Sequence, residues 1–207
     1  MQKNTVGIQR GTQCMQRKTD VKKKRTGLVC GRFQVFHNDH LKYVLEAGKR
    51  CDHLIVGITS PDPSMSPAES ADENRGKKSS NPCTYYERMQ MVKRALKGAG
   101  FSDEEFDIVP FPIGRPELIR YYVPEDITCY ITIYDAWGES KKERLEELGY
   151  EVQVLWHVSP EEKGISASEI RKAIASGGEW KHLVPAEVYE YMVQYGIDKR
   201  IYGMNKK

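Results

Sequence analysis

Short apolar runs alternate with segments of helical periodicity along most of the chain. The apolar runs are rich in β-branched and aromatic residues and mostly lack polar alternation, which is typical of strands buried on both faces. These runs predict five strands, at residues 27–31, 53–59, 107–113, 127–133 and 150–156. Helical patterns predict helices between them, at 39–50, 84–99, 116–122 and 138–148, and an all-helical segment at 166–195.

This order of strands and helices predicts the fold class. It indicates an α/β, Rossmann-like fold with an open parallel five-stranded sheet, helices on both faces and a helical C-terminal segment. Helix starts support the assignment, because Thr84 with Glu87 and Ser166 with Glu169 have the spacing of capping boxes. Gly149 is placed to end the helix before the last strand.

Three segments depart from this pattern and set the domain limits. Residues 1–26 hold eight Lys or Arg against one acid, which predicts a disordered basic tail. That tail is a solvated extension or, alternatively, a contact for RNA or a membrane surface. Residues 60–83 are rich in Pro, Ser and charge and predict an inserted loop, either an active-site lid or a passive surface insertion. The folded domain is expected at 27–200, with a C-terminal tail at 201–207.

Composition is ordinary for a soluble globular protein, with 39% hydrophobic and 29% charged residues and a net charge of +3. No apolar run approaches the roughly 20 residues that cross a bilayer, and the N-terminus lacks the apolar core of a signal peptide. The five cysteines are scattered, and none forms a CxxC pair. This argues against a disulfide framework or a zinc knuckle, so we expect a protein of the reducing cytoplasm. We also expect no membrane partner and no specific nucleic-acid partner.

Candidate chemistry gathers in the loop GRFQVFHNDH, residues 31–40, which follows the first predicted strand. In an open parallel sheet, ligands bind outside the carboxyl ends of the strands. Gly31 permits close approach of the backbone, and the following helix N-terminus offers N–H groups to an anion. Arg32, His37 and His40 add cationic or hydrogen-bonding side chains. The loop is therefore predicted to bind phosphates.

Common nucleotide-binding and zinc-binding motifs do not match this loop. A dinucleotide fingerprint would need GxGxxG and a Walker A loop would need GxxxxGK[ST], and neither occurs here. A zinc site would need three or four convergent ligands, whereas only two histidines are local. A purely structural role for both histidines is the remaining alternative.

A second segment, GISASEIR at 164–171, follows the last predicted strand and opens a helix. The Ser166 and Ser168 hydroxyls, the first helical amides and Arg171 could together bind an anion. Taken alone, the segment is an ordinary capped helix with a surface arginine. Paired with residues 31–40, it forms the other side of a polyphosphate clamp.

These two segments resemble the signatures of the H-x-G-H nucleotidyltransferase superfamily, whose second motif is I-S-S/T-x-x-I-R. From about residue 27 to 200, the chain is most similar to archaeal-type nicotinamide mononucleotide adenylyltransferases. NPCTYYERMQMV at 81–92 resembles their NPFT-x-x-ER run, and GGEWKHLVPAEVYEYM at 177–192 resembles their GxxWxxLVPxxV tail. The resemblance implies that 27–200 is a nucleotidyltransferase domain.

The chain also departs from that family at the nucleotide and acceptor sites. Asp39 stands where H-x-G-H has glycine, and Val35 replaces a proline. TIYDAWGES at 132–140 replaces a TGN- or SGN-like turn, and residues 112–124 differ as well. We therefore expect the transfer chemistry to be retained and recognition to differ. The alternative to an adenylyltransferase is a CTP-dependent cytidylyltransferase acting on a small, phosphonoformate-like phosphonate, since phosphonate cytidylyltransferases are similar to this family.

The resemblance implies a reaction in which an anionic oxygen of a small phosphate-bearing acceptor attacks the α-phosphorus of a nucleoside triphosphate and pyrophosphate leaves. His37, His40 and Arg171 are the expected catalytic residues. Mg²⁺ is the expected cofactor, bridging the triphosphate with few protein ligands. Nucleotide binding is expected from Gly31, Phe33, Asp39, Ile165, Ser166, Ser168, Tyr134, Asp135 and Trp137. Acceptor binding is expected from Arg32, Gln34, Thr59, Arg88 and Arg75.

Two points stay open at this level. Either Trp137 or Tyr134 lines the base or acceptor pocket, or the aromatic residue is a core residue at a strand end. A non-catalytic nucleotide sensor or RNA-binding regulator is the alternative to an enzyme, although both catalytic signatures are present apart from Asp39. The expected partners are a nucleoside triphosphate and a small phosphorylated or phosphonate substrate, and the chain can also be expected to form a homo-oligomer.

Overall fold

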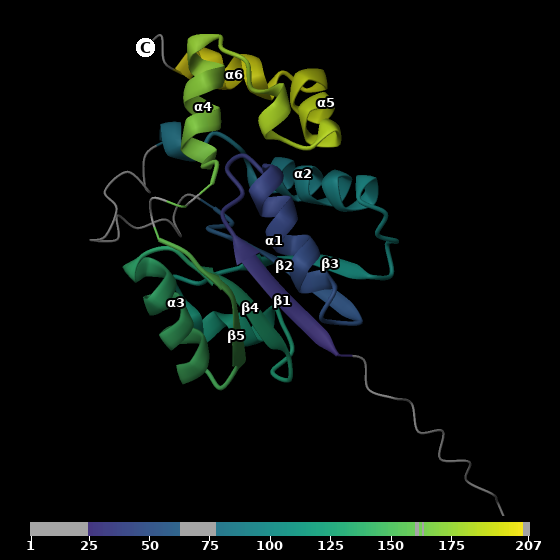
Figure 1. Cartoon of the computed structure of the whole chain (residues 1–207), viewed down its shortest axis with the longest axis vertical. Coiled ribbons are helices and arrows are strands. Elements are labelled where there is room, and N and C mark those ends of the chain that lie inside the picture. Colours follow the sequence, from purple (N-terminus) through teal and green to yellow (C-terminus); the bar gives the residue numbers. More distant parts are fainter. Residues whose placement is uncertain (1–24, 63–77, 160–161, 163, 205–207) are drawn as a thin grey trace, which may run out of the picture.

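The structure, a computed structural model, describes residues 25–62, 78–159, 162 and 164–204. Its centre is a five-stranded parallel sheet with the strand order β3-β2-β1-β4-β5 (Figure 1). The strands are β1 (Thr26–Gly31), β2 (His53–Thr59), β3 (Phe106–Phe111), β4 (Thr128–Ile133) and β5 (Glu151–His157). Each lies within about two residues of its prediction from the apolar runs, and the α/β, Rossmann-like fold class is confirmed.

Helices cover both faces of the sheet because the strands bury side chains on both sides. On β1, Val29 packs into one core cluster, whereas Leu28 and Cys30 pack into the other. The first cluster is covered by α1 (Asn38–Gly48) and α2 (Tyr85–Gly98), and the second by α3 (Ala136–Glu147) and η3 (Pro116–Tyr121). In the described chain the predicted helix at 116–122 is thus a 3₁₀ helix, and η2 (Lys78–Ser80) precedes α2.

The strand order reverses between β1 and β4, and this is where the sheet opens. The register of β1 with β2 runs to Gly31, whereas the register of β1 with β4 covers only Gly27 and Leu28. The two strands therefore diverge toward their carboxyl ends. A crevice outside the carboxyl ends at such a reversal is the usual ligand site of an open α/β sheet.

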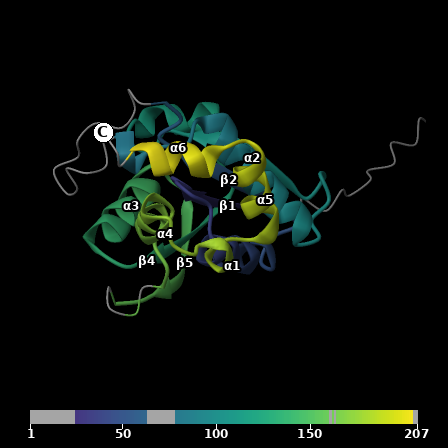
Figure 2. The same ribbon diagram turned by 90° about the horizontal axis from the view of Figure 1, so that it is seen from above.

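The C-terminal segment is helical, as expected, and consists of α4 (Ala167–Ser176), η5 (Lys181–Leu183), α5 (Ala186–Gln194) and α6 (Ile197–Met204). The helices lie together at the end of the sheet where β1 ends (Figure 2). Gly177 ends α4 with φ 73°, which explains why 166–195 is not continuous helix.

Helix α6 continues past the expected domain end at residue 200. Ile201 is 4% exposed and Ile197 is fully buried, and both lie on the face of α6 that packs on the rest of the domain. Their i, i+4 spacing on one helix face is the signal that the boundary at 201–207 overlooked. Residues 1–24, the loop 63–77 and residues 205–207 lie outside the described chain, so the tail and lid predictions are not addressed. Within the described parts, no helix is long and apolar enough to cross a membrane.

Candidate active site

A cavity of about 350 Å³ lies at the carboxyl ends of β1 and β4, where the sheet opens. Its walls come from the loop after β1, the first turn of α1, the end of β4 and the segment that enters α4. It brings together twelve of the residues expected at the site: Arg32, Phe33, Gln34, His37, Asp39, His40, Tyr134, Asp135, Ile165, Ser166, Ser168 and Arg171. The two separate sequence signatures thus form one cavity.

The two histidines are held as a pair at the start of α1. His37 is the N-cap, and its Nδ1 accepts the backbone N–H of His40 at 3.4 Å, while the His40 Nδ1 accepts the backbone N–H of His37 at 3.4 Å. The rings stack with centroids 3.6 Å apart. In a neutral imidazole whose Nδ1 accepts, the proton sits on Nε2. Each ring therefore has Nε2–H as its donor, which suits a phosphate oxygen.

Two aromatic rings fix the orientation of His40. The Phe33 ring packs edge-on against it at 5.0 Å between centroids, and the Phe36 ring lies at 5.6 Å. Phe33 and Phe36 are themselves buried. The imidazole is thus oriented before any ligand binds, which reduces the entropy lost on binding.

Arg171 crosses from the first turn of α4 to the loop after β1. Its guanidinium donates to the backbone carbonyl of Gln34 and, at 3.0 Å, to Oγ of Ser168. Burial, with a further contribution from the positive charge of Arg32, lowers its pKa to about 10, so it stays charged at neutral pH. Two guanidinium groups that repel each other at one end of a cavity create a strong preference for a bound anion.

The N-terminus of α4 adds backbone donors to the same wall. Ser166 is the N-cap: its hydroxyl accepts the Glu169 N–H at 3.3 Å and donates to Glu169 Oε2 at 2.8 Å. The predicted capping box is therefore confirmed, and this hydroxyl organises the helix end. The first-turn amides of Ala167 and Ser168 have no acceptor within the helix, since the first four N–H groups of any helix lack one.

Arg88 occupies a different place from the one expected for an acceptor ligand. It is 2% exposed and donates to the backbone carbonyls of Arg32 at 3.0 Å, Thr59 at 2.7 Å and Ser60 at 2.8 Å. Burial lowers its pKa to about 10. Arg88 thus ties the ends of β1 and β2 together, and neither it nor Thr59 lines the cavity wall.

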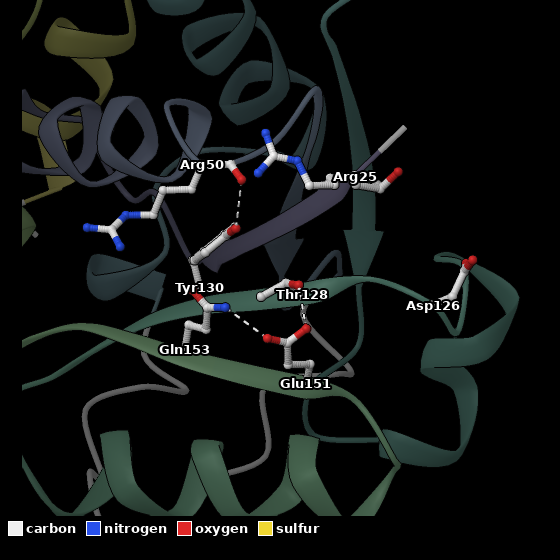
Figure 3. A pocket seen from close by; sticks show the side chains of 8 residues that line it. Arg25, Arg50, Asp126, Thr128, Tyr130, Glu151 and Gln153 are labelled. Atoms are coloured by element: carbon white, nitrogen blue, oxygen red, sulfur yellow. Dashed lines mark hydrogen bonds between the residues drawn. The ribbon is translucent and has the colours of Figure 1, made fainter. Parts of the chain in front are cut away.

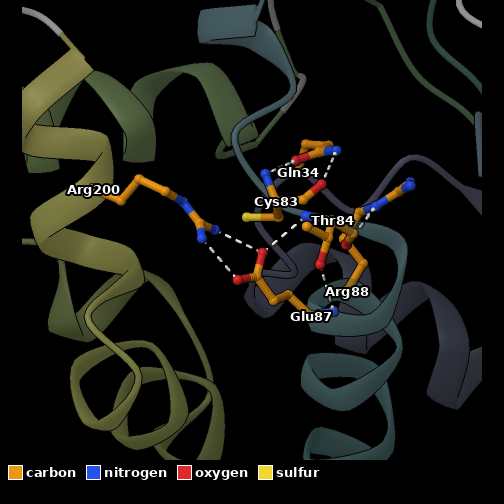
Figure 4. Close-up of polar contacts among 6 residues, drawn as sticks. All are labelled: Gln34, Cys83, Thr84, Glu87, Arg88 and Arg200. Carbon is orange, nitrogen blue, oxygen red and sulfur yellow. Dashed lines mark hydrogen bonds and ion pairs between the residues drawn. The ribbon is translucent and has the colours of Figure 1, made fainter. Parts of the chain in front are cut away.

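The side chain of Gln34 also has a structural contact. Its amide donates to the Cys83 carbonyl and accepts the Cys83 N–H, both at 2.9 Å, which joins the loop after β1 to the start of α2 (Figure 4). Burial raises the pKa of the Cys83 thiol to about 12, so it is not a nucleophile at neutral pH. Glu87 extends the network by accepting from Arg200 of α6 at 2.6 and 2.8 Å.

Two other expected residues, Gly31 and Trp137, do not line the cavity wall. Gly31 is needed for packing, because a Cβ there would come within 2.7 Å of the Phe33 ring. The Phe33 backbone has a φ of 52°, and its ring folds back over Gly31. Trp137 packs against the second core cluster and under Arg144, with the guanidinium 5.2 Å from the ring centroid. This favours the core alternative for Trp137. Arg75 lies outside the described residues.

Four cavity residues were not among the expected site residues: Tyr43, Thr132, Gly164 and Ala167, of which the last two lie within the predicted segment 164–171. Tyr43 lies one helical turn after His40, and this spacing could have revealed it. Its hydroxyl donates to the Tyr130 carbonyl at 2.5 Å, which ties α1 to β4. Gly164 had no such signal, because its role depends on a contact with Asp39 across the cavity.

A second hollow, of about 590 Å³, lies at the opposite end of the sheet, near the amino ends of β1, β4 and β5 (Figure 3). Its two arginines are paired with carboxylates. Arg25 pairs with Asp52 at 3.4 Å and Arg50 pairs with Glu46 at 2.9 Å. Glu151 accepts from Thr128 and Gln153. The hollow is larger, but it offers no excess of positive charge to a phosphate.

The described residues contain no group of three or more His, Cys, Asp or Glu side chains placed to hold a metal ion. The chemistry of the cavity is instead that of an anion site with cationic and N–H donors. A divalent cation would fit there as a counter-ion that arrives on the phosphates, because Mg²⁺ keeps much of its water and few protein ligands in such complexes.

Comparisons with known proteins agree with this geometry. The family model described as cytidylyltransferase-like matches residues 28–173. The chain is 45% identical over 176 residues to the phosphonoformate cytidylyltransferase of Streptomyces viridochromogenes, covering 85% of this chain and 95% of that protein. It is 31% identical over 180 residues to the nicotinamide-nucleotide adenylyltransferase of Methanococcus aeolicus, covering 87% of this chain and 95% of that protein.

Among solved structures, a bifunctional NMN adenylyltransferase/ADP ribose pyrophosphatase from Francisella tularensis, complexed with AMP and a Mn ion, matches with a TM-score of 0.63. The identity is 16%, so this likeness supports the fold alone. The match covers 89% of this chain and 53% of that chain, so this chain spans about half the length of the bifunctional protein.

Proposed function

This chain belongs to the cytidylyltransferase-like family, and we propose that it transfers CMP from CTP to a small phosphonate resembling phosphonoformate, releasing pyrophosphate. The chain is a nucleotidyltransferase, and its resemblance to that superfamily is confirmed. The nucleotide and the acceptor are the proposed part. The observation that carries the choice is the 45% identity to a phosphonoformate cytidylyltransferase over nearly its whole length.

Nicotinamide mononucleotide adenylyltransfer, which the sequence motifs placed first, is the second candidate. Relatives with that name are about 31% identical over similar lengths, for example the protein from Methanococcus aeolicus. The difference between 45% and 31% identity reverses the order of the two candidates. Asp39 and the segment 132–140, where the chain departs from the adenylyltransferase pattern, agree with this reversal.

In the proposed reaction an anionic phosphonate oxygen attacks the α-phosphorus of CTP. The new O–P bond forms as the bond between the α-phosphorus and the bridging oxygen breaks, and pyrophosphate leaves with that electron pair. Because the attacking oxygen is already anionic, no general base is needed. The protein then has to position the reactants and stabilise negative charge, as in other phosphoryl transfers.

The cavity residues suit those tasks. The Nε2–H donors of His37 and His40 would bind the triphosphate and the charge that develops at the α-phosphorus. Arg171 and the first amides of α4 would hold the departing β- and γ-phosphates. Arg32, nearby on the loop after β1, would bind the acceptor. When bound, Mg²⁺ would neutralise part of the triphosphate charge, and we propose that the substrate carries it.

Location and assembly remain predictions. The described cysteines Cys30, Cys51, Cys83 and Cys129 are free thiols, which supports the expected cytoplasmic location. A role for the basic tail at 1–26, a lid function for the loop at 60–83 and formation of a homo-oligomer are likewise predictions.

A pyrophosphate-release panel tests the proposal. The purified chain is incubated with each of CTP, ATP, GTP and UTP against phosphonoformate, nicotinamide mononucleotide and nicotinate mononucleotide. We expect turnover with CTP and phosphonoformate. Turnover confined to ATP and a pyridine mononucleotide would overturn the proposal in favour of the second candidate.

A further inference from the structure

We propose that Asp39 is a specificity-determining residue that binds the nucleoside half of the nucleotide, by accepting a hydrogen bond from a ribose hydroxyl or from an exocyclic amino group of the base. The inference rests on the proposed function and names what the same cavity selects. It starts from the residue at which the chain departs most sharply from the H-x-G-H pattern.

The position of Asp39 is fixed by its surroundings. It is the second residue of α1 and lines the same cavity as His40 and Arg171. Its carboxylate lies directly over the α-carbon of Gly164, so that a Cβ at residue 164 would overlap Oδ2. Asp39 and Gly164 therefore form a complementary pair, in which the glycine leaves room for the carboxylate.

The charges of the cavity determine what part of a ligand can meet Asp39. Arg32, Arg171 and the N-terminus of α4 form a cationic wall that suits the phosphates. A carboxylate repels phosphate oxygens, so the triphosphate cannot lie against Asp39 without a compensating cation. The nucleoside half of the nucleotide is neutral and carries hydrogen-bond donors, so it can lie against Asp39.

Tyr134, at the end of β4, marks the same side of the cavity. Burial raises the pKa of its phenol, and the negative charge of Asp39 raises it further. The phenol therefore stays protonated at neutral pH and adds an aromatic face and a hydroxyl beside the carboxylate. An aromatic ring next to a hydrogen-bond acceptor suits a nucleoside better than a phosphate.

The donors of a nucleoside are few and chemically distinct. An ionised carboxylate only accepts hydrogen bonds. It pairs with the N4 amino group of cytosine or the N6 amino group of adenine, and an oxo group at the same position would be repelled. It pairs equally well with a ribose hydroxyl. Both sources present the same chemistry to Asp39, and nucleotide analogues separate them.

The test measures kcat/KM by pyrophosphate release with the nucleoside triphosphate that the wild-type protein uses and with its analogues. The analogues are the 2′-deoxy and 3′-deoxy forms and the oxo form of the base, UTP for CTP or ITP for ATP. The variants are Asp39→Asn, which keeps the shape, and Asp39→Gly, which restores the H-x-G-H residue. We expect one selectivity ratio to fall by about 10- to 100-fold in both variants, since hydrogen bonds to charged groups contribute that much.

Glu46→Gln is the matched control. It removes a carboxylate from the same helix, where Glu46 pairs with Lys49 and Arg50 away from the cavity. It should leave every ratio at the wild-type value. If the Asp39 variants lower the ratio of kcat/KM for the amino nucleotide to that for the oxo nucleotide, Asp39 binds the base. If they lower the ratio of kcat/KM for the ribonucleotide to that for a deoxyribonucleotide, Asp39 binds the sugar.

Two results would overturn the role of Asp39. In the first, both variants turn over and all ratios are unchanged. In the second, the variants change only the Mg²⁺ concentration that gives half-maximal activity, which would make Asp39 a metal ligand. If the wild-type protein releases no pyrophosphate from any nucleoside triphosphate, the proposed function itself fails, and the role of Asp39 with it.

Discussion

The hollows at the two ends of the sheet differ in size and in electrostatic character. The hollow at the amino ends is the larger, about 590 Å³ against about 350 Å³ for the cavity at the carboxyl ends. Its arginines, Arg25 and Arg50, face carboxylates. In the carboxyl-end cavity, the hydrogen-bond partners of Arg171 are a carbonyl and a hydroxyl.

Carbonyl and hydroxyl oxygens orient a guanidinium without neutralising it. Arg171 thus keeps its full positive charge, and its interaction with Arg32 concentrates that charge in one place. An ion pair such as Arg25 with Asp52 leaves little net field for a ligand. Concentrated positive charge, rather than volume, therefore distinguishes the cavity that we propose binds the triphosphate.

The largest contrast between the two ends should come from one substitution in each. His40→Ala removes the Nε2–H donor that we propose binds the phosphates and should lower kcat by about 10²- to 10³-fold, by analogy with loss of one oxyanion donor. Arg50→Ala breaks only the pair with Glu46 and should leave kcat unchanged. Initial rates of pyrophosphate release check both. Equal losses of kcat in the two variants would mean that the two hollows do not differ in their importance for catalysis.

The next contrast is between a buried arginine near the carboxyl-end cavity, Arg88, and an exposed arginine at the amino-end hollow, Arg25. Arg88→Met leaves the carbonyls of Arg32, Thr59 and Ser60 without their donor, and should lower the free energy of unfolding by about 2–3 kcal/mol. It should also raise the KM for the acceptor, because Arg32 loses its anchor. Arg25→Met, at an exposed pair, should leave the urea midpoint near that of wild type. A wild-type midpoint for Arg88→Met would contradict this role.

The smallest contrast lies within the carboxyl-end cavity. Gly164→Ala should raise the KM for the nucleotide about fivefold, because the new methyl group displaces the Asp39 carboxylate. In an Asp39→Gly background the same change should have almost no effect, which corresponds to a coupling energy of about 1 kcal/mol. A double-mutant cycle on KM measures this coupling. Additive effects would mean that the two residues act independently.

Much of the fold could be predicted because buried parallel strands have a simple signature. An apolar run such as LVC at 28–30 must be covered on both faces, and the alternation with helices then fixes a parallel sheet. The crevice follows from the strand order, so its two motifs could be placed at one site. The last helix, α6, was harder to predict because its apolar pair, Ile197 and Ile201, spans only one helical turn.

The direction of individual side chains could not be predicted in the same way. The sequence places Arg88 near the cavity, but whether its guanidinium points at a ligand or at backbone carbonyls depends on packing in three dimensions. Trp137 follows β4 as expected, yet its half-buried ring packs against the second core cluster and does not line the cavity. The contact between Asp39 and Gly164 joins residues 125 positions apart, and no local pattern encodes it.

The central claim is that the carboxyl-end cavity is the triphosphate site. Calorimetric titration of CTP with Mg²⁺ into the wild-type protein, Arg171→Ala and Arg50→Ala tests it directly. We predict one binding site in the wild-type protein, binding at least about tenfold weaker in Arg171→Ala because a charged hydrogen-bond donor is lost, and wild-type affinity in Arg50→Ala. Unchanged affinity in Arg171→Ala together with weakened binding in Arg50→Ala would contradict the claim and place the nucleotide at the opposite end of the sheet.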